Sequence, residues 1–436
     1  MPYFSHVFVA RITLEAKTPL ALSTGSEDGL FDTDLVRDAN GLPMIPGTSL
    51  AGVLRHLYEK TQQETRLSVN ELFGYQEKNK KNLQASRLDV SCAHVHDQNG
   101  QAISGVYPEI ATTSDPILHW LRQPQPLVRE GVAITHRGAA KKQAKFDLTL
   151  VPAGTRFSFE IRLNANDKPV DYADDKTSGD IPEKNIPEKN TTETKASEEK
   201  VIPDLARDQR TFEHLLALCH NDYFRLGARS RSGLGIMKAH RLSWRAFHLR
   251  PEGGQDFSDF GALSTTFSDH THLNPWEHRT ENPSLHVQLK LKPKDFWRMG
   301  QGFQPLTEDA RQPDLMTWTE RRIQYPEHYP DHRSEKQSTS ACARITDPMP
   351  VLTGTGLKGA LRHRVAYHIN RRAGRFADQL SDSDSNCDSD GNSDSDSNSD
   401  SDSNSDIETL MPEVDELFGC IANYDRTRRT PLVFRL

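Results

Sequence analysis

Hydrophobic and polar positions along the first 250 residues predict a sheet with helices packed on it. Residues 8–14 alternate between apolar and polar side chains, which is typical of a half-buried strand. From Leu50 the apolar residues recur at the spacing of a helix with one buried face, and Gly-Thr-Ser at 47–49 is expected to supply a turn and a cap. The same two patterns return later, as strands over 146–150, 155–163 and 236–247 and a helix around 212–219. This order predicts an α+β, ferredoxin-like fold.

An internal repeat divides the chain into two related units. IPGTSLAGVLRH at 45–56 and LTGTGLKGALRH at 352–363 are identical at seven of twelve positions, and ELFG at 71–74 returns at 416–419. The alternating stretch before the first copy has a counterpart in residues 286–302, predicted to be a strand that runs into a glycine-bearing loop. We expect two ferredoxin-like units, the second of them truncated.

Composition narrows the class of protein. The 436 residues suggest two or three domains. The sequence holds no apolar run long enough to span a membrane and no apparent signal peptide. Five scattered cysteines without a CxxC pair disfavour a disulfide scaffold and a zinc ribbon. A protein of the reducing cytoplasm is expected, with no membrane partner.

The net charge of −7 comes from two segments that we expect not to fold. Residues 381–406 form a Ser/Asp tract with nine Asp and no Lys or Arg, which predicts disorder. Residues 165–200 carry a tandem IPEKN and a charge of −4, as a mobile insertion would. The rest of the chain has a charge of +6, which is compatible with a nucleic-acid partner. The predicted organisation is a complete unit over 1–250, a linker over 251–283 and a partial unit over 284–436.

Three basic, glycine-bearing motifs indicate phosphate binding. Helix starts attract phosphate through free N–H groups, and backbone amides of glycine loops cradle it while arginines pair with it. The alternatives are an ordinary capped helix, a solvated basic turn and a solvated loop. The predicted residues are, at the first helix start, Gly47, Thr48, Ser49 and Arg55; at its repeat, Gly354, Thr355, Lys358 and Arg362; in the loop 226–242, Gly227, Arg229, Arg231, Gly233 and Gly235; and in a basic hairpin within 121–147, Arg137, Lys141 and Lys142.

An acidic loop precedes the first helix start. Asp32, Asp34 and Asp38 lie within seven residues, and carboxylates beside bound phosphate can hold a divalent metal. Turn chemistry of aspartate is the alternative explanation. Cys92, His94 and His96 alternate and would share one face of a strand, but the sequence offers no evident fourth metal ligand.

These motifs, taken in order, resemble the RAMP superfamily of CRISPR-associated proteins. The matching stretches are GLPMIPGTSLAGVLR at 41–55, ELFG, ITHRGAAKKQAKFDLTLVPAGTRFSFEI at 134–161 and the loop LGARSRSGLG. Similarity is greatest to the backbone subunits of type III effector complexes. It implies an RRM-like core that binds guide RNA through its backbone, with other effector subunits and complementary target RNA as partners. The basic hairpin would be the thumb that wedges into the guide–target duplex.

The resemblance also implies chemistry. An Asp in the loop before the helix start would make the chain an endoribonuclease that cleaves target RNA with a divalent metal, Mg or Mn, and the target's own 2′-hydroxyl. Asp32 is the best match and would be catalytic and a metal ligand, with Asp34 as the fallback. The second unit lacks the corresponding acid, so it is predicted to bind RNA without cutting it.

Two alternatives stay open: a purely structural RNA-binding subunit, and a guide-processing endoribonuclease using His56 or His136.

Overall fold

The computed structural model describes residues 4–24, 34–61, 65–76, 83–134, 140–166, 205–250, 290–297, 299–301, 316–326, 342–374, 417–418 and four isolated positions between 253 and 260. Asp32, His136 and Arg137 lie outside these residues. So do nearly all of the insertion at 165–200, most of the linker and the whole Ser/Asp tract. The division into domains therefore stays a prediction.

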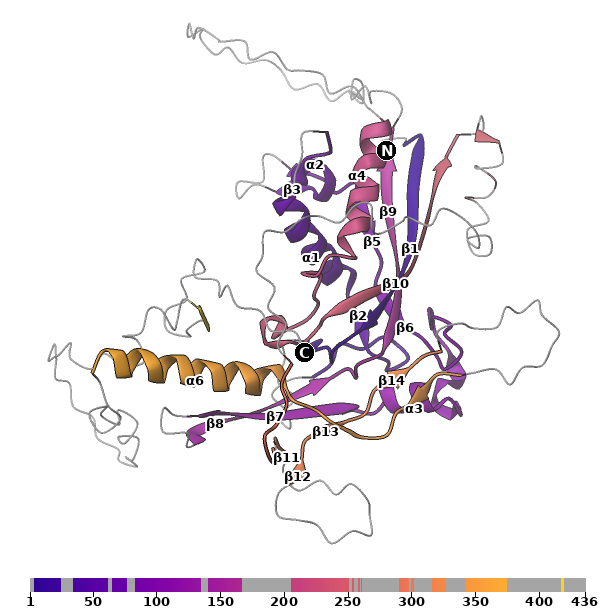
Figure 1. The fold of residues 1–436 in the computed structure, drawn as a ribbon. Coiled ribbons are helices and arrows are strands. Elements are labelled where there is room, and N and C mark those ends of the chain that lie inside the picture. Colours follow the sequence, from indigo (N-terminus) through magenta and orange to yellow (C-terminus); the bar gives the residue numbers. More distant parts are fainter. Residues whose placement is uncertain are drawn as a thin grey trace, which may run out of the picture.

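The main sheet has the strand order of a ferredoxin-like fold. Its antiparallel strands run β10 (Met237–His248), β1 (His6–Ala16), β9 (Arg156–Ala165), β6 (Ala93–Val95) and β2 (Met44–Ile45), with β5 (Leu88–Val90) also paired to β9. The first and last core strands are neighbours, and the third lies between the first and second (Figure 1). The predicted α+β class and ferredoxin-like order are confirmed.

Two helices cover one face of this sheet (Figure 1). The buried positions of α1 (Gly47–Lys60) and α4 (Leu205–Leu218) share one hydrophobic core with the inward side chains of β1. The alternation of side chains along β1 places its inward apolar residues on the face that the helices cover, because successive side chains point to opposite faces of a strand. The innermost side chains are those of Phe8, Ile12, Leu14, Leu50, Leu54, Tyr58, Phe212 and Leu215.

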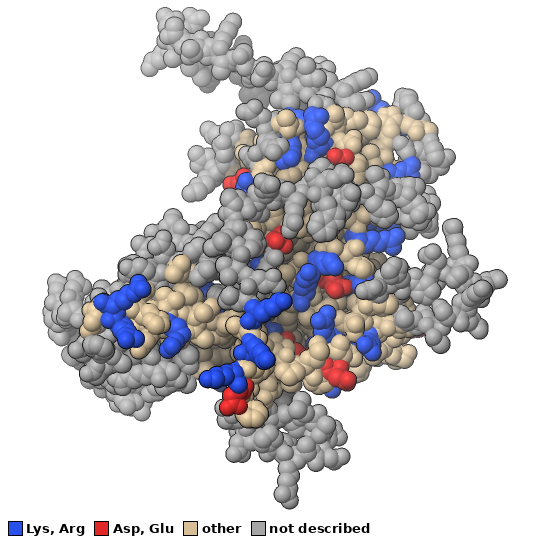
Figure 2. Space-filling view, in the orientation of Figure 1, with Lys and Arg blue, Asp and Glu red and all other residues tan. Residues whose placement is uncertain are grey.

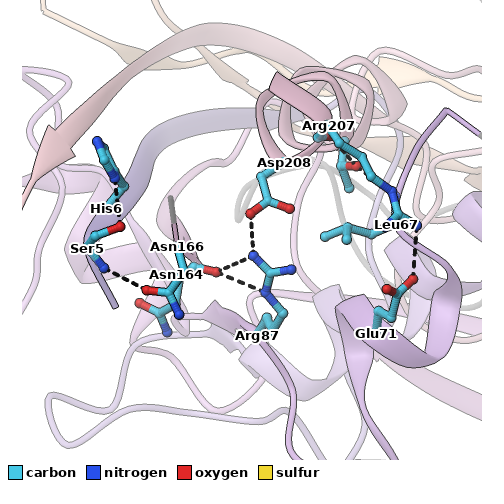
Figure 3. Close-up of polar contacts among 10 residues, drawn as sticks. Ser5, His6, Leu67, Glu71, Arg87, Asn164, Asn166, Arg207 and Asp208 are labelled. Atoms are coloured by element: carbon cyan, nitrogen blue, oxygen red, sulfur yellow. Dashed lines mark hydrogen bonds and ion pairs between the residues drawn. The ribbon is translucent and has the colours of Figure 1, made fainter. Parts of the chain in front are cut away.

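Ion pairs at one end of the sheet fix α4 and α2 (Val69–Phe73) in place (Figure 3). The Arg87 guanidinium pairs with Asp208 on α4 and donates to the Asn164 carbonyl on β9. Arg207 lies 3.3 Å from the Glu71 carboxylate. Burial raises the pKa of Glu71, but hydrogen bonds from Ser68 and the charge of Arg207 outweigh it and the net pKa is lowered. These contacts hold α4 and α2 in fixed positions relative to the sheet.

A long hairpin extends from the sheet between β6 and β9. It consists of β7 (Leu127–Ile134) and β8 (Ala140–Leu150) and follows the short helix α3 (Pro116–Leu121). Two small strands, β3 (Tyr75–Gln76) and β4 (Leu83–Gln84), pair beside α2. The predicted basic hairpin is confirmed as a hairpin.

Residues 316–326 and 342–350 pack against the first unit. They contain the short strands β12 (Met316–Thr317), β13 (Thr319–Glu320), β14 (Ile323–Gln324), β15 (Arg344–Ile345) and β16 (Met349–Pro350); β12 pairs with β11 (Gly300–Gln301). Ile323, Tyr325 and Ala343 join the main core. The Ile323 N–H donates to the Ala153 carbonyl at 2.9 Å. This region of the second unit is therefore a strap across the first.

Helix α6 (Gly354–Arg372) repeats α1 in sequence and in one contact. Phe418 packs against Val365, which corresponds to the neighbouring pair Phe73 and Tyr58 of the first unit. The rest of the helix differs, since Leu54 is fully buried and its counterpart, the Leu361 side chain, is 36% exposed. Figure 1 shows α6 projecting from the body. Of the helices that the structure describes, none has the length and apolarity needed to cross a bilayer.

Two local expectations are wrong. Residues 47–49 lie inside α1, whose N-cap is Pro46 without a side-chain cap, because the proline sets the extended backbone that starts the helix. The strand expected at the start of residues 286–302 is also not seen in its described part, whereas Gly300–Gln301, where the loop is expected, forms β11. Residues 290–297 have no regular structure there, and all their side chains are exposed.

Candidate RNA-binding surface

The glycine-rich loop between α4 and β10 is closed tightly over the chain. Gly227, Gly233 and Gly235 all have positive φ angles, which favour glycine. A Cβ at Gly227 would collide with the Ala21 carbonyl, and one at Gly235 with that of Leu226. The glycines are therefore required for the loop's own shape.

An arginine in this loop joins it to the hairpin. Arg229 has a φ of 54°, an uncommon conformation for a residue with a side chain. Its guanidinium lies 4.0 Å from the centre of the Phe146 ring on β8, within cation–π distance. The Arg225 guanidinium donates to the Ser230 carbonyl at 2.8 Å and stabilises the turn. Strained residues of this kind are common at binding sites.

Three cations from two distant segments meet at the start of α6, in what we call the basic junction: Arg231, Lys358 and Arg362. The turn Ser230–Ser232 contacts α6, and Lys358 is half-buried. Burial lowers the pKa of Lys358, and the charges of Arg231 and Arg362 lower it further. No acidic residue lies in the first turn of α6. Figure 2 shows Lys and Arg side chains along α6 and over the neighbouring body.

The helix starts are built differently in the two units. In the second unit the Thr353 hydroxyl accepts the Gly356 N–H at 3.3 Å, and Gly354 and Thr355 open the helix behind that cap. In the first, Gly47 is buried against the backbone of Val90, so the close approach that needs glycine is to the chain itself. Their contact with RNA stays a prediction.

Other predicted residues of the first helix and the hairpin are placed as follows. Thr48 and Ser49 are exposed. The exposed Arg55 donates to the Gly74 carbonyl at 3.3 Å, beyond α2. Lys141 and Lys142 lie on β8, and the structure does not describe the side chains of these two residues.

The base of the hairpin is held by residues that the sequence pattern does not single out. Arg129 on β7 makes two hydrogen bonds with the Glu320 carboxylate, one of them 2.9 Å long, and only 11% of the Arg129 side chain and 7% of the Glu320 side chain are exposed. The Trp318 indole N–H donates to the same carboxylate at 2.8 Å. These partners are 191 residues apart, so no local signal marks them.

The described part of the acidic loop is engaged in turns. Both Asp38 oxygens accept hydrogen bonds, from the backbone N–H groups of Asn40 and Leu42 and from the Asn40 amide. Asp34 accepts the Leu35 N–H at 2.7 Å. Among the described residues no three His, Cys, Asp or Glu side chains are grouped to hold a metal. Asp34 and Asp38 therefore do not form a metal site by themselves.

The alternating Cys92, His94 and His96 form no metal site either. The ring of His96 lies 2.7 Å from the Ser158 hydroxyl, and burial lowers its pKa to about 4. His94 lies 3.7 Å from Asp38. The strand face is thus used for packing and hydrogen bonding.

Comparison with known proteins places the chain. The family model of the RAMP superfamily matches residues 13–238, half of the sequence, and the chain belongs to that superfamily. No curated protein matches it. Among solved structures it is similar to a chain from a cryo-EM structure of the Type III-B Cmr-beta bound to cognate target RNA. That similarity has 13% identity and a TM-score of 0.30, and it covers 55% of this chain and 60% of the other.

Proposed function

We propose that this protein is a backbone subunit of a type III CRISPR ribonucleoprotein that binds guide RNA along the basic junction. Membership of the RAMP superfamily supports the class. The observation that carries the proposal is the meeting of the glycine-rich loop with the start of α6. Both were predicted as phosphate-binding motifs from sequence alone.

The chemistry of the junction suits a phosphate chain and does not read bases. Arginine presents a planar fork of donors that matches phosphate oxygens, and lysine adds a point charge. The helix start adds backbone N–H groups. Burial lowers the pKa of Lys358 most, and the charges of Arg231 and Arg362 lower it further. A bound polyanion would offset the repulsion among these three cations.

The first test is to purify the protein together with the products of its neighbouring genes and sequence the RNA that comes with it. Short RNAs of uniform 5′ end with a repeat-derived tag are expected. Lys358→Glu should reduce the bound RNA at least tenfold, while Arg371→Glu, exposed at the other end of α6, should change it little. A protein that purifies without RNA contradicts the proposal.

We infer from the resemblance that the subunit also cleaves target RNA, with Asp32 as the catalytic residue and Mg or Mn as the metal. Asp34 and Asp38, the described acids of the loop, do not form a metal site by themselves. Asp32→Ala should abolish cleavage at one spacing and leave assembly intact, while Asp28→Ala, four residues earlier in the sequence, should cleave normally. If Asp32→Ala cleaves normally, the chain is a purely structural RNA-binding subunit, which is the first of the two alternatives that the sequence leaves open.

A further inference from the structure

Two neighbouring aromatic side chains are exposed to solvent a few residues before β11. Phe296 is 100% exposed and Trp297 is 46% exposed. They end a stretch in which Lys290, Lys292 and Lys294 are exposed as well. Burying large aromatic rings is among the strongest stabilising terms in a protein, so an adjacent pair with one ring fully and the other about half exposed indicates a surface that a partner covers.

The aromatic pair is anchored close to the basic junction. The carbonyl of Met299, two residues after Trp297, accepts a hydrogen bond from the backbone N–H of Trp318 at 2.7 Å. Its sulfur lies 3.3 Å from both the backbone nitrogen and the hydroxyl of Thr353, the N-cap of α6. Three extended residues span at most about 11 Å, so Phe296 lies within that distance of Met299. The Asp295 carboxylate accepts the Phe296 N–H at 2.9 Å and fixes the turn before the rings.

We propose that Phe296 and Trp297 are a stacking platform for unpaired bases of RNA whose phosphates lie on the basic junction, a site that rests on the proposed function. Aromatic rings interleaved with lysines suit single-stranded nucleic acid, because every base has a face to stack and every phosphate needs a cation. A protein partner is disfavoured because the cores of protein interfaces are depleted in lysine. The second unit thus contributes base stacking to the RNA site.

The experiment measures binding of a fluorescent 12-mer oligouridine to the full-length chain freed of co-purified RNA. The double variant Phe296→Ala/Trp297→Ala should bind at least about thirtyfold more weakly, because stacking contributes about 1–3 kcal/mol for each of two bases. Phe296→Tyr/Trp297→Phe keeps two rings and should bind like the parent chain. Tyr107→Ala removes another exposed aromatic and is the control. Ultraviolet cross-linking should label the peptide with Phe296 and Trp297.

Salt dependence separates stacking from charge. Loss of the rings should leave the slope of affinity against salt unchanged, and Lys358→Glu should make it shallower. If the parent chain binds no RNA, the proposed function itself fails. If the parent binds and the double alanine variant binds equally well, only the platform is overturned. A double variant that keeps RNA affinity but loses self-association, measured by sedimentation, makes the pair a protein-docking surface and also overturns it.

Discussion

Space and backbone conformation both require glycine at position 227. Its φ is +78°, and a Cβ there would collide with the backbone of Ala21. Gly227→Ala should therefore lower the free energy of unfolding by more than the 1–2 kcal/mol typical of a left-handed residue, and should weaken RNA binding because the loop carries Arg229 and Arg231. Urea unfolding and RNA titration measure the two effects.

Gly105 is a matched control for this substitution. It has a φ of +92° but nothing lies within 4 Å of its Cβ direction, so Gly105→Ala should cost only the backbone strain. Equal losses for the two alanine variants would mean that the clash at Gly227 is relieved by a small shift, and that the loop is less tightly fixed than its geometry indicates.

His96 should make the protein sensitive to acid. The unfolded side chain takes up a proton below pH 6.5, whereas burial holds the folded pKa at about 4. The unfolded state therefore binds more protons between these values, and stability falls as the pH decreases from 6.5 to 4, by up to about 3 kcal/mol. His96→Gln should flatten this part of the curve of unfolding free energy against pH. His119→Gln, at an exposed position on α3, should not. Parallel curves for the parent and His96→Gln would show that the imidazole is protonated in the folded state.

At the scale of elements, the hairpin depends on a buried ion pair supplied by the strap. Glu320→Ala removes the partner of Arg129 and the acceptor of the Trp318 indole, and leaves a buried guanidinium without its carboxylate. Breaking such a pair costs about 3–5 kcal/mol. The measurement is urea unfolding of Glu320→Ala, Arg129→Ala and the double variant, whose losses should not add.

The hairpin contains a surface pair for comparison. Glu130 and Lys145 are exposed and 3.3 Å apart, so Glu130→Ala should cost less than about 1 kcal/mol. A similarly small loss for Glu320→Ala would mean that the strap does not hold the hairpin.

Across the whole molecule, the sequence predicts what local patterns control. Alternation and helical spacing place the core strands and helices, since each element buries one face, and their order implies the observed sheet. Contacts between distant segments leave no such pattern, so neither the Arg129–Glu320 pair nor the meeting of Arg231 with Lys358 could be predicted. Spacing also cannot distinguish a turn-forming Asp38 from a metal ligand, because both uses need a carboxylate in a loop.

The two units are expected to fold as one body. Besides the Ile323 contact, the Tyr325 hydroxyl donates to the His96 carbonyl at 3.1 Å, and the Ala343 N–H donates to the Gln98 carbonyl at 2.8 Å. A fragment of residues 1–250 leaves the surface under these residues uncovered, and should unfold at lower urea than the full chain. A fragment of residues 1–374 keeps the strap and should unfold at nearly the same urea concentration as the full chain.

Ile323→Ala in the full chain tests the same interface without truncation. A buried isoleucine replaced by alanine costs about 2–5 kcal/mol because apolar contact is lost and a cavity remains. The loss should appear in the unfolding of the first unit, followed by the fluorescence of Trp244 in a chain whose other tryptophans are phenylalanine. An unchanged Trp244 transition would show that the strap unfolds separately and that the units are independent, as two repeats in tandem would be. A shifted transition means that the second unit stabilises the sheet that carries the glycine-rich loop, so that both halves of the basic junction form together.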